Sequence, residues 1–226
     1  IFSAPVKGWY GIYMLDYGEE NHVSLNYADS IRFVMDSDAY GIYGIRLLAD
    51  SIDKTTVDLE AGKEIFLSNE SGAAVYNVGE SFNFSAPNIS IRSGGSFSLW
   101  TDYYRSGSSE AGTTNITGET ISIVSTGTDD DSYGVVTSGN PNLSKTNGFT
   151  TIEGNTIAIH SENMGALLSK NYASAVVTGK QVALTSQNGF AIGTLNSAVS
   201  TVKGETVVVS SNALPYVVYT DGQGSI

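Results

Sequence analysis

Apolar residues alternate with polar or small residues in several stretches of this chain, and the alternation is most regular in the C-terminal third. The apolar members there are Ile157 and Ile159, Val182 and Leu184, and Val207 and Val209. An alternation with a period of two residues puts successive side chains on opposite sides of the backbone. This is the pattern of a β-strand with one buried face. The sequence therefore predicts a short strand in each of these stretches.

The three stretches belong to a repeat of 25 residues. Equivalent segments span residues 151–161, 176–186 and 201–211, with Gly154, Gly179 and Gly204 at the same position of each copy. A unit of this length that contains only short strands cannot bury its apolar face alone, so it must stack on copies of itself. We therefore predict an all-β fold, a right-handed parallel β-helix (β-solenoid) in which each repeat forms one coil.

Equivalent residues of neighbouring coils are expected to stack about 4.8 Å apart, as ladders along the tube. The predicted inner ladders are Ile152, Val177 and Val202; Ile157, Val182 and Val207; and Leu167, Ile192 and Val217. A polar ladder of Ser161, Ser186 and Ser211 is predicted at one corner, where hydroxyl groups satisfy backbone groups of the turns.

The same pattern continues toward the N-terminus with longer connections between coils. Corner positions are predicted at Ala28, Gly62, Ala86, Gly118 and the three repeat glycines. Paired inner positions are predicted at Ile31 and Phe33, Ile65 and Leu67, Ile89 and Ile91, and Ile121 and Ile123. Val75, Leu99 and the segment 133–136 are predicted to close the last three of these coils.

We expect a single domain over residues 1–226, with about seven to eight coils on a base repeat of 24 or 25 residues. Residues 1–22 would form an irregular first coil or cap, residues 23–218 the coils, and residues 219–226 the truncated continuation of a longer chain.

Charge and composition exclude some classes of partner. The chain has 11 Lys and Arg against 23 Asp and Glu, a formal net charge of −12, and no segment that clusters basic residues, so nucleic acid is not an expected partner. No apolar run approaches the roughly 20 residues that span a bilayer, so this segment is not expected to insert in a membrane. The absence of cysteine is compatible with export into an oxidising space.

An aromatic insertion, residues 100–112, is the strongest candidate for a binding site. Trp100, Tyr103, Tyr104 and Arg105 are of the residue types that dominate recognition surfaces. The alternative is that Trp100 only shields a neighbouring coil. Two polar excursions, residues 128–132 and 137–147, leave the next coil, and we expect one continuous patch if all three loops emerge from the same corner.

Other residues have a structural interpretation beside a functional one. Asp129, Asp130 and Asp131 could hold Ca²⁺, which takes oxygen ligands, or could form a solvated turn. No other cofactor is expected. Tyr13, Tyr43, Tyr76 and Tyr219 are placed to form a structural stack along one face, and His160 is predicted to be an outward surface residue of a regular coil.

Catalytic motifs are largely missing. Polygalacturonase-like enzymes carry an Asn-Thr-Asp, an Asp-Asp, a His-Gly and an Arg-Ile-Lys in successive coils, and only an Asp-Asp, Asp130-Asp131, is present here. Arg92 and Arg105 stand nearest to the acidic run but lie in no lyase motif, and no nucleophilic serine motif occurs. We therefore assign no catalytic residue and do not expect an enzyme.

Taken together, coils of 20-odd residues, corners rich in Gly, Ser, Thr and Asn, an acidic charge and the lack of cysteine resemble the passenger domain of type V autotransporter adhesins of Gram-negative bacteria. The resemblance covers about residues 23–218, rests on repeat style and assigns no site residue. It implies secretion across the outer membrane and display on the bacterial surface. It also implies binding through inserted loops to a host or bacterial glycan, a matrix protein or an identical chain. The alternatives are a polysaccharide-degrading β-helix enzyme and a purely structural spacer.

Overall fold

The computed structural model describes residues 2–4, 11–16, 21–36, 38–46, 55–103, 111–212, 216–221 and 224–226. Its strands are β1 (Phe2–Ala4), β2 (Ile12–Asp16), β3 (His22–Tyr27), β4 (Ser30–Met35), β5 (Tyr40–Arg46), β6 (Thr56–Ala61), β7 (Glu64–Asn69), β8 (Ala73–Val78), β9 (Ser81–Ser85), β10 (Asn88–Ser93), β11 (Leu99–Asp102), β12 (Thr113–Thr117), β13 (Thr120–Ser125), β14 (Val135–Ser138), β15 (Gly148–Ser161), β16 (Gly165–Lys170), β17 (Ala173–Ser186), β18 (Phe190–Leu195), β19 (Val199–Lys203), β20 (Thr206–Ser211) and β21 (Val218–Thr220). A 3₁₀ helix, η1 (Pro141–Leu143), lies between β14 and β15. Among the described residues, no helix is long and apolar enough to cross a membrane.

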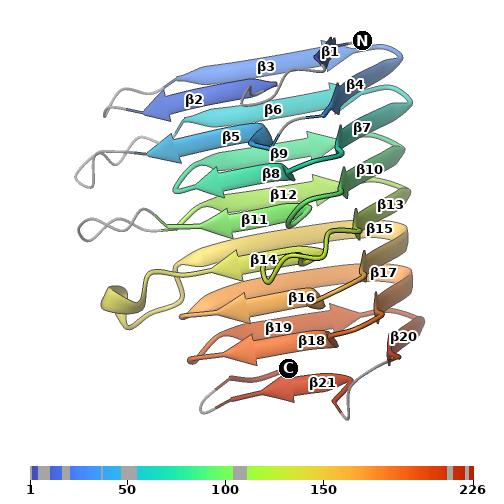
Figure 1. Ribbon diagram of the computed structural model, residues 1–226. Helices are drawn as coiled ribbons and strands as arrows, with labels where there is room; N and C mark the ends of the chain where they lie inside the picture. The colour runs from blue at the N-terminus through green and yellow to red at the C-terminus, as the bar shows by residue number, and fades with distance from the viewer. Residues whose placement is uncertain are drawn as a thin grey trace.

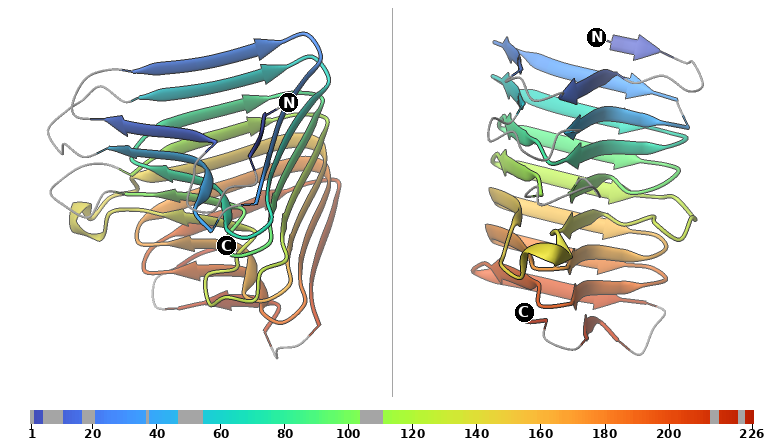
Figure 2. Two further views of the ribbon diagram at one scale, coloured as in Figure 1. Left: turned by 45° about the horizontal axis from the view of Figure 1, so that its top comes forward. Right: turned by 90° about the vertical axis from the view of Figure 1, so that its left-hand side faces the viewer.

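The strands form a 13-stranded sheet and an 8-stranded sheet, and they pair in parallel with the equivalent strands of neighbouring coils (Figure 1). The larger sheet has two arms, because β15 and β17 are long strands that continue through a corner. The molecule therefore has three faces, and the left view of Figure 2 shows the stack tilted so that its top comes forward. We call them the first face (β3, β6, β9, β12, β19 and the first halves of β15 and β17), the second face (β1, β4, β7, β10, β13, β20 and the second halves) and the third face (the 8-stranded sheet). This is an all-β structure of the β-solenoid type.

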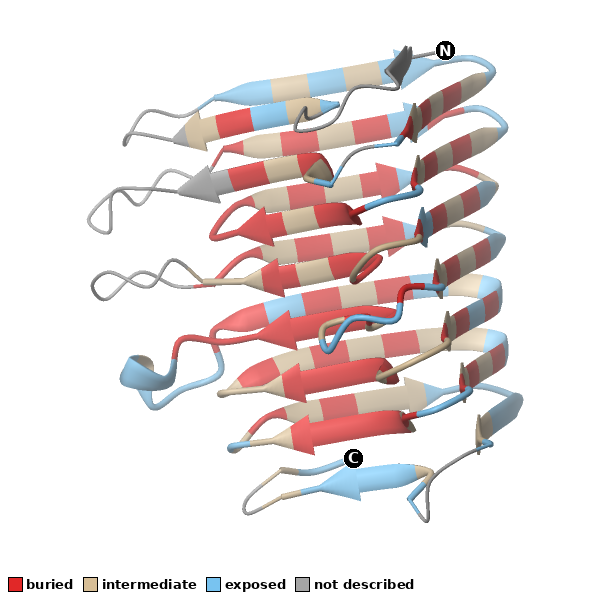
Figure 3. Ribbon diagram, viewed as in Figure 1, coloured by how far each residue is buried: buried red, intermediate tan, exposed pale blue. Residues whose placement is uncertain are grey.

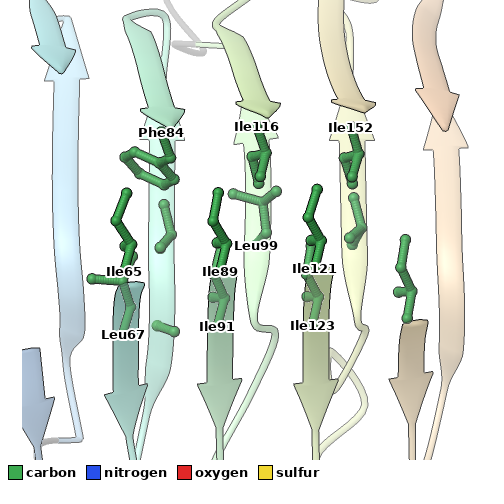
Figure 4. Close-up of a cluster of buried hydrophobic side chains, with 14 of the residues drawn as sticks. Ile65, Leu67, Phe84, Ile89, Ile91, Leu99, Ile116, Ile121, Ile123 and Ile152 are labelled. Atoms are coloured by element: carbon green, nitrogen blue, oxygen red, sulfur yellow. The ribbon is translucent and has the colours of Figure 1, made fainter. Parts of the chain in front are cut away.

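The inner ladders of the second face have the predicted register. Ile65, Ile89, Ile121, Ile157 and Val182 pair in sequence, and so do Leu67, Ile91, Ile123, Ile159 and Leu184. These side chains are at most 2% exposed, and with residues of the other two faces they fill the centre of the tube (Figure 4). Figure 3 shows the resulting alternation of buried and less buried positions along the strands. The alternating pattern of the sequence thus specified both the strands and their buried side.

Two details of the predicted ladders are wrong at the C-terminal end. Val207 pairs with Val182 as predicted, but its side chain is 40% exposed, because no further strand of the described structure pairs with β20 on its other side. On the third face Ile192 pairs with Val218 and not with Val217. The connection that follows Ser211 is one residue longer than the one that follows Ser186, which shifts the register by one.

The serine ladder is confirmed and longer than predicted. Ser93, Ser125, Ser161, Ser186 and Ser211 occupy one register position at the corner between the second and third faces. Ser161 Oγ donates to the Ser132 carbonyl at 2.6 Å, and Ser125 Oγ donates to the Ser96 carbonyl at 2.7 Å. The hydroxyl groups thus satisfy turn carbonyls that would otherwise be buried without a partner.

The repeat glycines allow close approach of successive corners between the first and second faces. A Cβ atom added at Gly154 would lie 2.8 Å from the Gly118 carbonyl oxygen, and one added at Gly179 would lie 2.9 Å from that of Gly154. A side chain at these positions would push neighbouring coils apart. This explains the glycine at intervals of 25 residues.

Candidate functional site

The sequence predicted a position in an inserted loop for Trp100, but this residue lies in β11 on the third face. Its neighbours in the strand, Leu99 and Thr101, are fully buried, so the indole is on the outer side of the sheet. Tyr103 follows the strand and is half-buried. Tyr104 and Arg105 lie outside the described residues. One of the four predicted binding residues, Trp100, is therefore a strand residue that packs on a neighbouring coil.

The outer side of the third face carries a column of stacked aromatic rings. Tyr13, Tyr43, Tyr76 and Trp100 occupy equivalent positions of β2, β5, β8 and β11. The ring centroids of successive members are 5.5, 5.4 and 5.9 Å apart. The predicted tyrosine stack is confirmed for its first three members. Tyr219 occupies the same column but is separated from Trp100 by Val136, Leu168 and Gly193.

Two further rings widen this column into an aromatic cluster, by which we mean Tyr40, Tyr43, Tyr76, Phe97 and Trp100. The Tyr40 centroid lies 5.0 Å from that of Tyr76 and 6.0 Å from that of Phe97. The Phe97 centroid lies 4.9 Å from that of Trp100 in an edge-to-face arrangement. Such pairs add stability beyond their buried area. The cluster is therefore a set of packed rings across three successive coils, in which Phe97 is buried.

A cation–π contact and a neighbouring hydrogen bond lie beside Trp100. Lys170 Nζ lies 4.4 Å from the indole centroid, a cation–π geometry, and Tyr76 donates a 3.1 Å hydrogen bond to the Asp102 carboxylate. Burial raises the pKa of Asp102, and hydrogen bonds from the Tyr103 backbone, Ser138 and Tyr76, with the charge of Lys170, oppose this rise. Burial beside Asp102 also raises the pKa of Tyr76, which keeps its hydroxyl protonated as a donor.

A groove of about 450 Å³ opens beside the aromatic cluster, at the corner between the second and third faces. Tyr40 and Phe97 line it together with the carboxylate-bearing residues Asp38, Asp129 and Asp131. We call it the acidic groove. Two of the three residues of the predicted acidic run thus share one groove with two aromatic rings, whereas Asp130 is not among its lining residues.

The Asp129–Asp131 turn comes from a different corner than the excursion at 137–147, so these two do not meet the condition for one continuous patch. It connects β13 to β14 and therefore precedes the third face. Strands β11 and β14 end at the far end of that face, where Thr101 pairs with Thr137. Figure 1 shows the η1 excursion projecting at the opposite side from the turn that enters β14. The strands of the third face separate the acidic turn from the η1 excursion.

The acidic turn is fixed mainly through its backbone. Asn163 Nδ2 donates to the carbonyls of Thr128 and Asp129 at 2.7 and 2.9 Å, and the Asp129 carbonyl accepts from the Ser132 amide at 3.1 Å. Within the described ranges no group of three His, Cys, Asp or Glu side chains is arranged to hold a metal ion. The carboxylates of the turn thus line a groove without converging on one point.

His160 has the predicted outward position in β15. Its ring contacts the Thr185 hydroxyl at 2.8 Å and the Glu162 carboxylate at 3.2 Å. Both partners are neighbours on the same outer surface of the coil stack. The histidine therefore belongs to the surface of the second face and not to the acidic groove.

The sequence interpretation missed Tyr40, Phe97 and Asp38. A signal was present, because an aromatic residue stands two positions before the inward closing residue in several coils. The examples are Tyr40, Phe97, Tyr133, Phe190 and Tyr216, which precede Ile42, Leu99, Val135, Ile192 and Val218. Alignment on the closing residue would have shown that these rings share one edge.

Comparison of the chain with protein-family models, curated proteins and solved structures gives no match. The case for a site therefore depends on geometry. Aromatic rings beside carboxylates can stack on the apolar face of a sugar ring and accept hydrogen bonds from its hydroxyl groups.

Proposed function

We propose that this chain is the ligand-binding part of a bacterial cell-surface adhesin, secreted across the outer membrane. In this proposal it is a right-handed parallel β-helix of about seven to eight coils that binds a surface glycan without altering it chemically. The single observation that carries the proposal is the acidic groove, which brings the rings of Tyr40 and Phe97 together with Asp38, Asp129 and Asp131. Largely preformed pockets with aromatic walls and a few polar groups are the usual form of small-ligand sites.

A glycan fits this groove better than an apolar ligand does. Each carboxylate can accept charge-assisted hydrogen bonds from sugar hydroxyl or amino groups. The rings of the aromatic cluster are already packed against one another, so little side-chain entropy is lost when a ligand stacks on Tyr40. The favoured ligand is therefore a neutral or amino sugar, and the loop with Tyr103, Tyr104 and Arg105 is a second contact in the proposal.

The second candidate is a polysaccharide-degrading enzyme, and the same groove favours it. Glycoside hydrolases use a pair of carboxylates that flank the scissile bond, and three carboxylates line this groove. The general acid of such enzymes is normally shielded from water, whereas Asp38 and Asp129 are exposed. We therefore prefer binding over hydrolysis. A purely structural spacer is the third candidate and requires no groove at all.

The test is binding of the purified chain to a panel of immobilised glycans, with matched tyrosine variants. Tyr40→Leu removes the aromatic face in the groove but keeps an apolar side chain. Tyr27→Leu changes a tyrosine that is 55% exposed on the first face and serves as the control. We expect a glycan that the parent and the Tyr27 variant bind and the Tyr40 variant does not. Circular dichroism establishes that both variants keep their strands.

Two charge variants and one loop variant complete the design. Asp129→Asn with Asp131→Asn should weaken binding about tenfold or more, whereas Asp29→Asn at a distant exposed corner should not. Tyr103→Ala with Tyr104→Ala reports on the loop contact. Release of reducing ends or unsaturated products, lost in Asp129→Asn with Asp131→Asn, would favour the enzyme. Absence of any bound glycan would favour the spacer.

A further inference from the structure

A second groove, of about 460 Å³, lies on the outer side of the second face. Arg32 and Arg92 line it together with Phe66, Ser68 and Glu70. We call it the arginine groove. Two of the 11 basic residues of the chain share it, although the net charge of the protein is −12. A local excess of arginine on so acidic a protein needs a physical explanation.

The strand register brings the two arginines to one place. Arg32 lies in β4 beside Phe66 of β7, and Arg92 lies in β10 beside Ser68 of the same strand. The residues on either side of each arginine are buried: Ile31 and Phe33 in β4, and Ile91 and Ser93 in β10. Both guanidinium groups therefore start on the outer face from strands that flank β7.

Arg32 is held in a defined position. Its Nη1 donates a 2.6 Å hydrogen bond to Glu64 Oε2, and its guanidinium carbon lies 4.4 Å from the centroid of the Phe66 ring. The ion pair fixes one side of the planar group, and the ring supports its face. Further N–H donors of the guanidinium remain for a ligand, because arginine has five and a carboxylate accepts at most two in a fork.

Arg92 is exposed, and its guanidinium group makes no hydrogen bond or ion pair with any residue in the described part of the chain. Its nearest outward neighbours across the sheet are Ser68 and Val124, neither of which carries a charge. The one carboxylate that lines the groove with the arginines is that of Glu70, which is exposed. No described carboxylate thus forms an ion pair with Arg92.

We propose that the arginine groove binds the anionic group of an acidic oligosaccharide, a carboxylate or a sulfate. Arg92 makes the fork-shaped contact, Arg32 adds a second donor, and the Ser68 hydroxyl and the Glu70 carboxylate contact the hydroxyl groups of the sugar. Guanidinium groups recognise such planar or tetrahedral anions by paired hydrogen bonds. This site is separate from the acidic groove, and the proposal does not depend on the proposed function of that groove.

The two grooves meet across short turns. Asn69 and Glu70 line the arginine groove, and the next two residues, Ser71 and Gly72, line the acidic groove. In the following coil Gly94 lines the arginine groove and Gly95 lines the acidic groove. A chain of sugars with one acidic unit would therefore place its anion on the second face and its uncharged units toward the aromatic rings. Repulsion from Asp129 and Asp131 would disfavour the reverse orientation.

The experiment measures calorimetric affinity for three hexasaccharides: a heparin fragment with sulfates and carboxylates, an oligogalacturonate with carboxylates only, and uncharged maltohexaose. The parent chain should bind at least one of the two acidic probes and bind maltohexaose much more weakly. Arg92→Gln should lower affinity for the acidic probe about tenfold or more. Arg92→Lys keeps the charge without the fork and should give an intermediate loss.

The control is Lys203→Gln, which removes one positive charge from an exposed position of β19 outside the groove. Its affinity should remain within about twofold of the parent, because exposed charges at a distance are screened by salt. Binding of the oligogalacturonate shows that a carboxylate is sufficient, and binding of the heparin fragment alone assigns a sulfate. Equal affinity of the parent and Arg92→Gln, or no binding of either acidic probe, would overturn the proposal. Loss of affinity for the acidic probes in Asp129→Asn with Asp131→Asn, together with unchanged affinity in Arg92→Gln, would place the anion site in the acidic groove instead.

Discussion

The Thr150 hydroxyl donates a 2.9 Å hydrogen bond to the Thr101 hydroxyl, which joins two residues 49 positions apart inside the tube. Both side chains are at most 1% exposed. The bond belongs to a chain in which Thr137 donates to Thr150 at 2.7 Å and Thr101 donates to Thr114 at 2.8 Å. Asn77 Nδ2 donates to Thr114 at 3.0 Å. This buried polar chain connects the third face to the first face across successive coils.

Replacement of Thr150 by Val should destabilise the protein by about 1–3 kcal/mol. Valine has nearly the same shape but leaves the Thr137 hydroxyl without an acceptor and the Thr101 hydroxyl without a donor. Urea unfolding followed by circular dichroism measures the effect. Thr117→Val, at an exposed position of β12, should change the unfolding free energy by less than about 0.5 kcal/mol. Equal effects of the two variants would show that the buried chain contributes no net stability.

Replacement of Val182 by Asp should unfold the C-terminal coils. Val182 is 2% exposed and pairs with Ile157 and Val207, so the carboxylate would be buried among apolar side chains without a partner. Limited proteolysis should detect new cleavage in residues 160–212. Gln181→Asp changes the adjacent, exposed position of the same strand and should leave the cleavage pattern of the parent. A folded and protease-resistant Val182 variant would contradict the ladder.

Replacement of Gly165 by Ala should destabilise the third face by about 1–3 kcal/mol. A Cβ atom at this position would lie 2.5 Å from the ring of Phe190, so the ring must move. The test is a double-mutant cycle with Phe190→Ala, in which unfolding free energies are compared. We expect Gly165→Ala to cost much less once the ring is gone. The same cost in both backgrounds would show that the backbone, and not the ring, requires glycine.

The pKa of Asp102 gives a pH dependence with a defined sign. Burial raises the pKa of Asp102 in the folded state, so protonation of this carboxyl stabilises the folded state. The stabilisation is complete below the unfolded-state pKa of about 3.9 and is lost as pH rises through the folded-state pKa of Asp102. Asp102→Asn removes the titration. The unfolding free energy of the variant relative to the parent should therefore increase from pH 4 toward pH 7.

Asp29 is the matched control with the opposite sign. The hydrogen bond and charge of Lys63 lower the pKa of Asp29, so its contribution is present above about pH 3.9 and is lost as pH falls. Asp29→Asn should therefore lose stability relative to the parent as pH rises from 3 to 5. Urea unfolding of the three proteins at a series of pH values tests both signs. Parallel pH profiles for the two variants would contradict this assignment.

The sequence by itself determined the strands, their buried sides and the stacking of equivalent positions. These features depend on a period of two within strands and a period of 25 between coils, and both are local or repeating properties of the chain. The pairing of Ile157 with Val182, and of Ser161 with Ser186, follows directly from them. The exception, Val218 in place of Val217, arose where one connection is a residue longer than its predecessor.

Only the tertiary structure decided which corner each excursion leaves and which side chains meet outside the tube. The sequence grouped Trp100 with the residues that follow it, whereas β11 places its ring on Phe97 and Tyr76. It also grouped the acidic turn with the excursions at 100–112 and 137–147, whereas Asp129 and Asp131 line a groove with Tyr40, about 90 residues earlier in the chain. Such contacts depend on how many residues each coil uses to cross a face. The repeat period constrains the inner ladders, because a misplaced inner side chain would leave a void or a clash, but it does not constrain the outer surface in this way.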